Sequence, residues 1–185
     1  MTRLKVPRLI PAIRQLEEWR LLQESAGDPK WAFVLGGTID AVAEMTGLLQ
    51  KRGWTVFVHV DMVRGLSGDS EGIKFFAGYV GSDGIISTHS QAIAHAKKVG
   101  LMAIQRIFLL DSQSVTTGVQ QVLSTHPDAV EVLPGLLPAV ARRVVDAIPY
   151  PVIAGGLIQR REEMDIMLAA GVQGISTSQR TLWTL

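Results

Sequence analysis

The chain has 185 residues, of which 47% are hydrophobic and 19% charged, so it can bury a sizeable core and is not a disordered protein. It contains no cysteine, which excludes disulfide bonds and thiolate chemistry. A net charge of +1 gives no overall attraction to nucleic acid, so any RNA-binding surface must be a local patch. No apolar run approaches the roughly 18 residues that span a membrane, and the basic start lacks a secretory signal, so we expect a cytoplasmic protein with no membrane partner.

Short apolar segments alternate with amphipathic segments along the chain. The predicted strands are Leu9–Ile13, Trp31–Leu35, Trp54–Asp61, Gly84–Ser87, Met102–Phe108, Ala129–Leu133, Val152–Ala154 and Gly174–Ser176. The predicted helices between them are Ile13–Glu24, Ile39–Lys51, Asp69–Tyr79, Ser90–Val99, Ser112–Leu123, Leu136–Ala147 and Arg161–Ala170. Strict alternation of strands and helices indicates parallel strands joined by crossover helices.

Eight such units predict an α/β fold, a compact (β/α)8 TIM barrel that forms a single domain over residues 1–185. The alternative is an open doubly wound sheet, but no Gly-x-Gly-x-x-Gly turn follows an early strand. The chain is shorter than the about 250 residues that are usual for this barrel, so its connections must be short.

Ionisable residues lie at the predicted carboxyl ends of three strands, where barrels of this class bind their ligands. In the third strand, alternate valines suit the face packed against helices, which turns His59 and Asp61 into the barrel mouth. Glu131 faces inward in the sixth strand for the same reason, and Arg106 lies near the end of the fifth. These groups either neutralise one another in an internal salt-bridge network or hold a polar ligand.

The last two predicted strands carry a pattern typical of phosphate binding. Gly155 and Gly156 end the seventh strand, and paired glycines let backbone N–H groups approach an anion closely. The hydroxyl residues at the end of the eighth strand are Ser176, Thr177 and Ser178. Barrels often bind phosphate on these two loops together with a short extra helix, which Gln179–Trp183 could form. Two ordinary turns remain the alternative.

Other kinds of chemistry have weaker support. A metal site built from His59, Asp61 and Glu131 has suitable ligand types, but their spacing does not demand it. No Gly-x-Ser-x-Gly elbow or cysteine supplies a nucleophile, and no lysine lies on a predicted strand. We therefore expect no catalytic residues, no metal and no cofactor.

Seven segments together resemble the glycerol-3-phosphate-responsive antiterminator family, which regulates glycerol uptake operons in bacteria. They are His59–Leu66, Asp83–Thr88, Ile104–Ser112, Pro127–Gly135, Ile153–Ile158, Ile175–Ser178 and Leu182–Trp183. The resemblance implies a TIM barrel that is not an enzyme, binds glycerol-3-phosphate as its effector and then acts on leader RNA. One departure is His89, which stands where the family usually has lysine and removes a fixed positive charge near the mouth.

The main hypothesis is therefore a glycerol-3-phosphate-sensing transcription antiterminator that binds the leader mRNA of glycerol utilisation genes. Its phosphate would lie on Gly155, Gly156, Thr177 and Ser178, with Ser176 beside them. Its glycerol hydroxyls would contact some of His59, Asp61, Arg106 and Glu131.

One rival hypothesis is a barrel enzyme acting on a phosphorylated metabolite, with Glu131 or Asp61 as base and His59 as acid. Another is a metabolite-binding barrel whose partner is a protein. A homo-oligomer is possible under any of these hypotheses.

Overall fold

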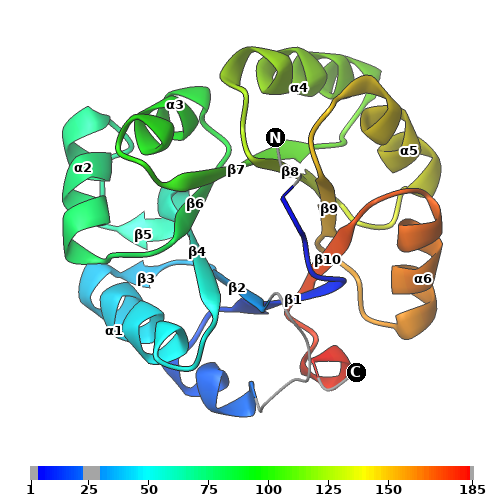
Figure 1. Cartoon of the computed structure of the whole chain (residues 1–185). Coiled ribbons are helices and arrows are strands. Elements are labelled where there is room, and N and C mark those ends of the chain that lie inside the picture. The colour runs from blue at the N-terminus through cyan, green and yellow to red at the C-terminus, as the bar shows by residue number, and fades with distance from the viewer. Residues whose placement is uncertain (1–3, 23–29, 184–185) are drawn as a thin grey trace.

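The computed structural model describes residues 4–22 and 30–183, and its strands close into a barrel (Figure 1). The barrel strands are β1 (Leu9–Ile13), β2 (Trp31–Val34), β4 (Thr55–His59), β6 (Gly84–Ser87), β7 (Met102–Phe108), β8 (Ala129–Leu133), β9 (Val152–Gly155) and β10 (Gly174–Thr177). Each strand pairs in parallel with its neighbours, and β1 pairs with both β2 and β10, which closes the circle. The predicted TIM barrel is confirmed, with strand boundaries within two residues of those expected.

Helices surround the barrel on the outside (Figure 1). In the described residues the α-helices are α1 (Ile39–Gln50), α2 (Ser70–Tyr79), α3 (Ser90–Lys98), α4 (Ser112–Thr125), α5 (Pro138–Ala147) and α6 (Arg161–Ala169). No helix in this part of the chain is long and apolar enough to cross a bilayer.

The prediction of an α-helix from Ile13 to Glu24 is wrong in its described part. Ile13 is the last residue of β1, and a 3₁₀ helix covers Leu16–Leu21; Glu24 lies outside the described residues. A second 3₁₀ helix, Arg180–Leu182, follows β10. Among the described residues, the segments that follow β1 and β10 contain a 3₁₀ helix and no α-helix.

Alternate side chains of each strand separate an inner core from an outer one. The inner cluster contains Trp31 and Phe57, whose ring centroids are 4.6 Å apart. The outer face of β4 contributes Val56 and Val58 to the layer beneath the helices. This alternation follows from the two-residue period of a strand and confirms the predicted orientation of the valines. His59 has the same parity as Phe57 and so points inward.

The chain leaves β4 earlier than predicted. The strand ends at His59, and Val60–Met62 form a 3₁₀ turn that takes Asp61 out of the strand alternation. Beyond the turn, β5 (Val63–Arg64) pairs with β3 (Gly37–Thr38), a small sheet that the sequence did not predict. Gly36 permits this pairing because a Cβ atom there would lie 2.6 Å from the carbonyl oxygen of Met62.

Candidate functional site

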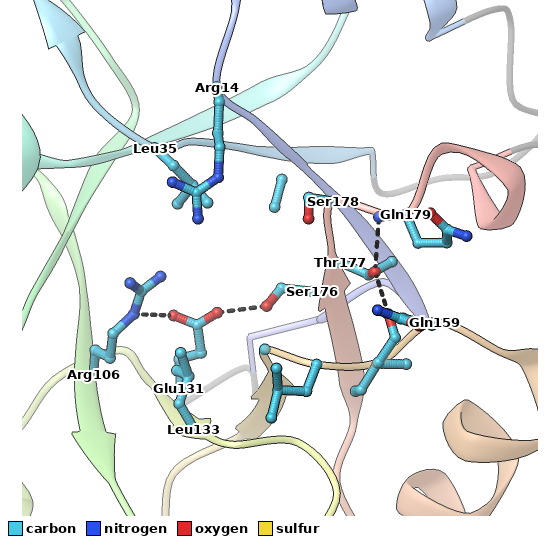
Figure 2. Close-up of a pocket in the computed structure, with 14 residues that line it drawn as sticks. Arg14, Leu35, Arg106, Glu131, Leu133, Gln159, Ser176, Thr177, Ser178 and Gln179 are labelled. Atoms are coloured by element: carbon cyan, nitrogen blue, oxygen red, sulfur yellow. Dashed lines mark hydrogen bonds and ion pairs between the residues drawn. The ribbon is translucent and has the colours of Figure 1, made fainter.

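A cavity of about 360 Å³ opens where β1, β8, β9 and β10 end (Figure 2). Its volume is in the range of small-molecule sites, and its position is the one where barrels of this class bind ligands. The lining residues are Ala12, Arg14, Leu35, Arg106, Glu131, Leu133, Gly156, Leu157, Ile158, Gln159, Ser176, Thr177, Ser178 and Gln179.

A buried carboxylate forms one wall of this cavity. Glu131 Oε2 accepts a hydrogen bond of 2.7 Å from Arg106 Nε, and Glu131 Oε1 accepts one of 2.5 Å from Ser176 Oγ. The Glu131 side chain is 2% exposed and that of Arg106 is 9% exposed, so each neutralises a charge that would be costly to bury alone. The terminal nitrogens of Arg106 remain on the cavity side (Figure 2). Part of the predicted internal ion-pair network is therefore present, and it lies within the cavity wall.

Gly155 makes room for this pair. A Cβ atom on Gly155 would lie 2.6 Å from Glu131 Oε1 and closer still to Ser176 Oγ. The expected reason for a glycine here was close approach of an anion, whereas the structure shows close approach of two side chains. Gly156 fits the original reasoning better, because its φ of +76° is a conformation that favours glycine, and it lines the cavity.

Thr177 connects the loops that follow β9 and β10. Its hydroxyl donates to the carbonyl oxygen of Ile158 at 2.8 Å and accepts from the backbone N–H of Gln179 at 3.0 Å. Trp183 Nε1 donates to the Thr177 carbonyl oxygen at 2.8 Å. The hydroxyl proton of Thr177 is thus already used, so this residue shapes the site, and the expected donation from its hydroxyl to a phosphate is not available.

Ser178 is the hydroxyl that remains free. It is exposed, lines the cavity and forms no side-chain hydrogen bond with any other described residue (Figure 2). The predicted extra helix is a single 3₁₀ turn, Arg180–Leu182, which is too short to act through a helix dipole. Polar side chains and loop N–H groups, rather than a helix start, must therefore hold any anion.

Arg14 is a charged cavity residue that the sequence analysis did not identify. It follows directly after β1, and its guanidinium projects into the cavity opposite Arg106 and Glu131 (Figure 2). Within the described residues its side chain forms no hydrogen bond or ion pair. The available signal was a charged residue immediately after a strand. The erroneous helix from Ile13 to Glu24 concealed it by placing Arg14 on a helix.

The electrostatics of the cavity favour an anion. Two guanidinium groups, from Arg14 and Arg106, face a space that contains one carboxylate, Glu131, which already accepts two hydrogen bonds. The backbone N–H groups of Gly156, Leu157 and Ile158 also have no acceptor among the described residues. Donors without acceptors, together with an excess positive charge, can bind a phosphate or carboxylate group.

His59 is buried close to the cavity but does not line it. The side chain is 4% exposed, and Nδ1 has no hydrogen-bond partner in the described part of the protein. Burial, reinforced by the positive charge of Arg106, lowers the pKa of His59 to about 4, so the imidazole is neutral at pH 7. His59 points inward as expected, while Arg106 is the residue that reaches the ligand space.

Asp61 does not point into the barrel mouth, contrary to the prediction. One oxygen accepts from Ser87 Oγ at 2.5 Å, and the other accepts from Thr88 N and Oγ1 at 2.7 and 2.8 Å. Partial burial acts to raise the pKa of Asp61, but these hydrogen bonds lower it below its usual value. Asp61 therefore fastens the loop after β6. Among the described residues, no three His, Asp or Glu side chains are placed to hold a metal ion.

The family model for the glycerol-3-phosphate responsive antiterminator matches residues 9–183. The chain belongs to this family. The chain is also similar to the solved glycerol uptake operon antiterminator regulatory protein of Listeria monocytogenes, at 32% identity and a TM-score of 0.89, covering 97% of this chain and 98% of the other. An antiterminator-related protein of Thermotoga maritima is 36% identical with a TM-score of 0.82, covering 96% of this chain and 98% of the other.

The other comparisons add little about function. The chain is 36% identical to the uncharacterized protein YgcP of Escherichia coli (strain K12), over 82% of this chain and 80% of that protein. Barrel enzymes that are 13% and 15% identical are similar in structure, and at that level the likeness shows only the fold. His89, the departure from the family pattern, is exposed before α3 and is not part of the cavity wall.

Proposed function

We propose that the protein senses glycerol-3-phosphate in the cytoplasm and then binds the leader mRNA of glycerol utilisation genes to allow transcription past a terminator. The single observation that carries the proposal is the pair of guanidinium groups, Arg14 and Arg106, facing a cavity at the carboxyl ends of the strands. Membership of the antiterminator family supports the same effector.

The phosphate of the effector lies between Arg14, Ser178 and the loop after β9. Arg14 supplies the charge-assisted contact, Ser178 donates through its hydroxyl, and Gly156 begins the run of free N–H groups. The glycerol hydroxyls then face Arg106 and Glu131, which present a donor and an acceptor side by side. A cavity of about 360 Å³ holds a three-carbon phosphate ester with a few waters.

Most of the other predicted site residues position the groups that contact the effector. Gly155 and Ser176 set the orientation of Glu131, and Thr177 holds the loops after β9 and β10 together. The neutral imidazole of His59 lies near Arg106 without competing for Glu131. These residues shape the site rather than touch the effector.

A binding role fits these residues better than turnover of the ligand. Arg106 and Ser176 stabilise the charge of Glu131, and Asp61 is bound to Ser87 and Thr88 and does not line the cavity, so neither is activated as a general base toward the ligand. Glycerol-3-phosphate is thus an effector that leaves unchanged. Incubation with the pure protein, with and without Mg²⁺, should return it quantitatively, and steady product formation abolished in Glu131→Gln would contradict the proposal.

The effector acts by selecting one arrangement of the loops around the cavity. A protein with a net charge of +1 has little general affinity for RNA, so the ligand must change which surface is presented. Coupling of this kind is typically about 1–3 kcal/mol, or about 5–150-fold in affinity, and it is reciprocal. Leader RNA should therefore tighten binding of glycerol-3-phosphate by the same factor.

The test is calorimetric titration with glycerol-3-phosphate and glycerol, followed by gel-shift titration of leader RNA at fixed salt with and without each compound. Glycerol-3-phosphate should bind and strengthen the RNA complex, and glycerol should do neither. Arg14→Ala should weaken ligand binding by about 10–100-fold through loss of a charge-assisted contact. The matched control is Arg143→Ala, an exposed arginine on α5, which should bind normally. RNA affinity that is identical with and without ligand would refute the sensor function.

A further inference from the structure

We infer that Glu18 is a positioning residue that fixes Arg14 at the cavity, and that Arg180 in turn fixes Glu18. The inference rests on the proposed function only in identifying the bound anion as the phosphate of glycerol-3-phosphate. The positioning role requires only that some anion binds beside Arg14. Neither Glu18 nor Arg180 lines the cavity, so both act through other residues.

Glu18 lies in the 3₁₀ helix that follows β1 and turns back onto the start of its own loop. Its Oε2 accepts from the backbone N–H of Arg14 at 2.6 Å and from that of Gln15 at 3.0 Å. The residue is 8% exposed, so these bonds are shielded from water. These bonds hold the backbone from which the Arg14 side chain starts, and that side chain extends toward the cavity (Figure 2).

Arg180 completes the arrangement from the other side. Its Nη2 and Nε donate to Glu18 Oε1 at 2.7 and 3.2 Å. Arg180 begins the 3₁₀ helix after β10, so this pair joins the loop after the last strand to the loop after the first. Burial acts to raise the pKa of Glu18, but the hydrogen bonds from Arg14, Gln15 and Arg180 lower it below its usual value.

The pair is part of a continuous belt of hydrogen bonds around one side of the cavity. Thr177 links Ile158, in the loop after β9, to Gln179, in the loop after β10. Arg180 follows Gln179 in the chain and contacts Glu18, which contacts Arg14. Three loops that supply the proposed phosphate contacts are therefore held in one relative position. An anion that binds all three loops should stabilise these hydrogen bonds. Loss of one of the hydrogen bonds should in turn weaken anion binding.

Both carboxylate oxygens of Glu18 are needed for this role. A glutamine at position 18 has one acceptor oxygen, so it can bind the backbone N–H groups or Arg180 but not both. Glu18→Gln should therefore release one of the two loops while keeping the size of the side chain. Arg180→Lys retains a charge but loses the two-pronged contact, so it should produce a weaker version of the same defect.

The experiment is a double-mutant cycle in the full chain, with inorganic phosphate and glycerol-3-phosphate as probes in calorimetric titrations. Glu18→Gln should weaken binding of both probes by about 10-fold in the wild-type background, as loss of one charge-assisted hydrogen bond implies. In the Arg14→Ala background the same change should weaken binding less than about 2-fold, because the residue it positions is gone. A merely structural role would lower affinity equally in both backgrounds.

The matched control is Asp128→Asn. Asp128 also joins a backbone N–H, that of Ala103, to a cation, Lys97, but at the opposite end of the barrel. The Asp128→Asn variant should have a lower melting temperature than the wild type and an unchanged ligand affinity. If Glu18→Gln folds poorly, Arg180→Lys carries the same cycle, with an expected loss of about 3–5-fold.

The outcomes separate this inference from the proposed function. Equal losses in the two backgrounds, with glycerol-3-phosphate binding intact, overturn the positioning role and leave the sensor function standing. Phosphate binding that obeys the cycle, without any preference for glycerol-3-phosphate, supports the positioning role and refutes the sensor function. A wild-type protein that binds neither probe overturns both.

Discussion

The polar side chains at the two ends of this barrel differ in whether they have partners within the protein. At the amino ends of the strands, Asp83 accepts from the backbone N–H of Val56 at 2.8 Å and from Gln50 Nε2 at 3.1 Å. Asp128 likewise accepts from Ala103 and Lys97. At the carboxyl ends, by contrast, the side chains of Arg14 and Ser178 have no partner among the described residues, and His59 keeps an unpartnered nitrogen in the interior.

This contrast shows where stability and binding are located in one fold. Carboxylates at the amino ends fasten neighbouring βα units together, so their hydrogen-bonding capacity is satisfied within the protein. The exposed donors at the carboxyl ends have no partner among the described residues, so they add little to stability and keep capacity for a ligand. Stability and ligand affinity should therefore separate when residues at the two ends are changed.

The largest effect should come from breaking the buried ion pair in the cavity wall. Arg106→Met leaves Glu131 buried without its counter-charge, which should lower the free energy of unfolding by about 3–5 kcal/mol. Urea denaturation at pH 7 measures this. The double variant Arg106→Met with Glu131→Gln should recover much of the loss, since no uncompensated charge remains. A single variant as stable as wild type would mean that water reaches Glu131.

Gly155→Ala should be next in size. The added methyl group would overlap Glu131 Oε1 and Ser176 Oγ, so we expect a loss of about 1–3 kcal/mol together with weaker ligand binding. The control is Gly47→Ala in α1, where a Cβ atom meets nothing within 4 Å and helix propensity should add up to about 1 kcal/mol. If Gly155→Ala lowers the free energy of unfolding and Gly47→Ala raises it, the contrast between the site and its surroundings is supported. If both variants change the free energy of unfolding in the same direction, that contrast is lost.

The pH dependence of stability should report His59. Its pKa is about 4 in the folded protein and about 6.5 when unfolded, so the unfolded chain binds more protons between these values. Stability contributed by the neutral imidazole is therefore present above pH 6.5 and is lost as the pH falls toward 4. Between pH 7 and pH 5 the loss should be about 2 kcal/mol. This loss of stability between pH 7 and pH 5 should be smaller in His59→Gln. It should be unchanged in His89→Gln, which replaces an exposed histidine.

The smallest effect should come from the amino end. Asp83→Asn keeps one acceptor for the N–H of Val56 and should cost about 0.5–1.5 kcal/mol. Its affinity for glycerol-3-phosphate should equal that of the wild type in a calorimetric titration. A loss of affinity comparable with that of Arg14→Ala would show that the two ends of the barrel are coupled, and the division of roles proposed here would fail.

The sequence by itself determined the barrel, because alternation of short apolar runs with amphipathic segments is local information that each βα unit carries independently. It also placed Glu131 on the inner face, since a two-residue period decides which side chains share a face. The sequence also placed Gly156 and Ser178 at the carboxyl ends of two consecutive units, and both residues line the cavity.

The tertiary structure alone decided what these residues contact. Gly155 is needed for the approach of Glu131 and Ser176, which come from strands 24 and 21 residues away in the chain. Asp61 leaves the strand alternation because Ser87 and Thr88 offer three hydrogen bonds. Arg14 reaches the cavity because β1 lies beside β10, the first strand next to the last. Closure of the barrel creates that neighbourhood, so the charged residue after β1 was a local sign of a site, but its neighbours in that site were not.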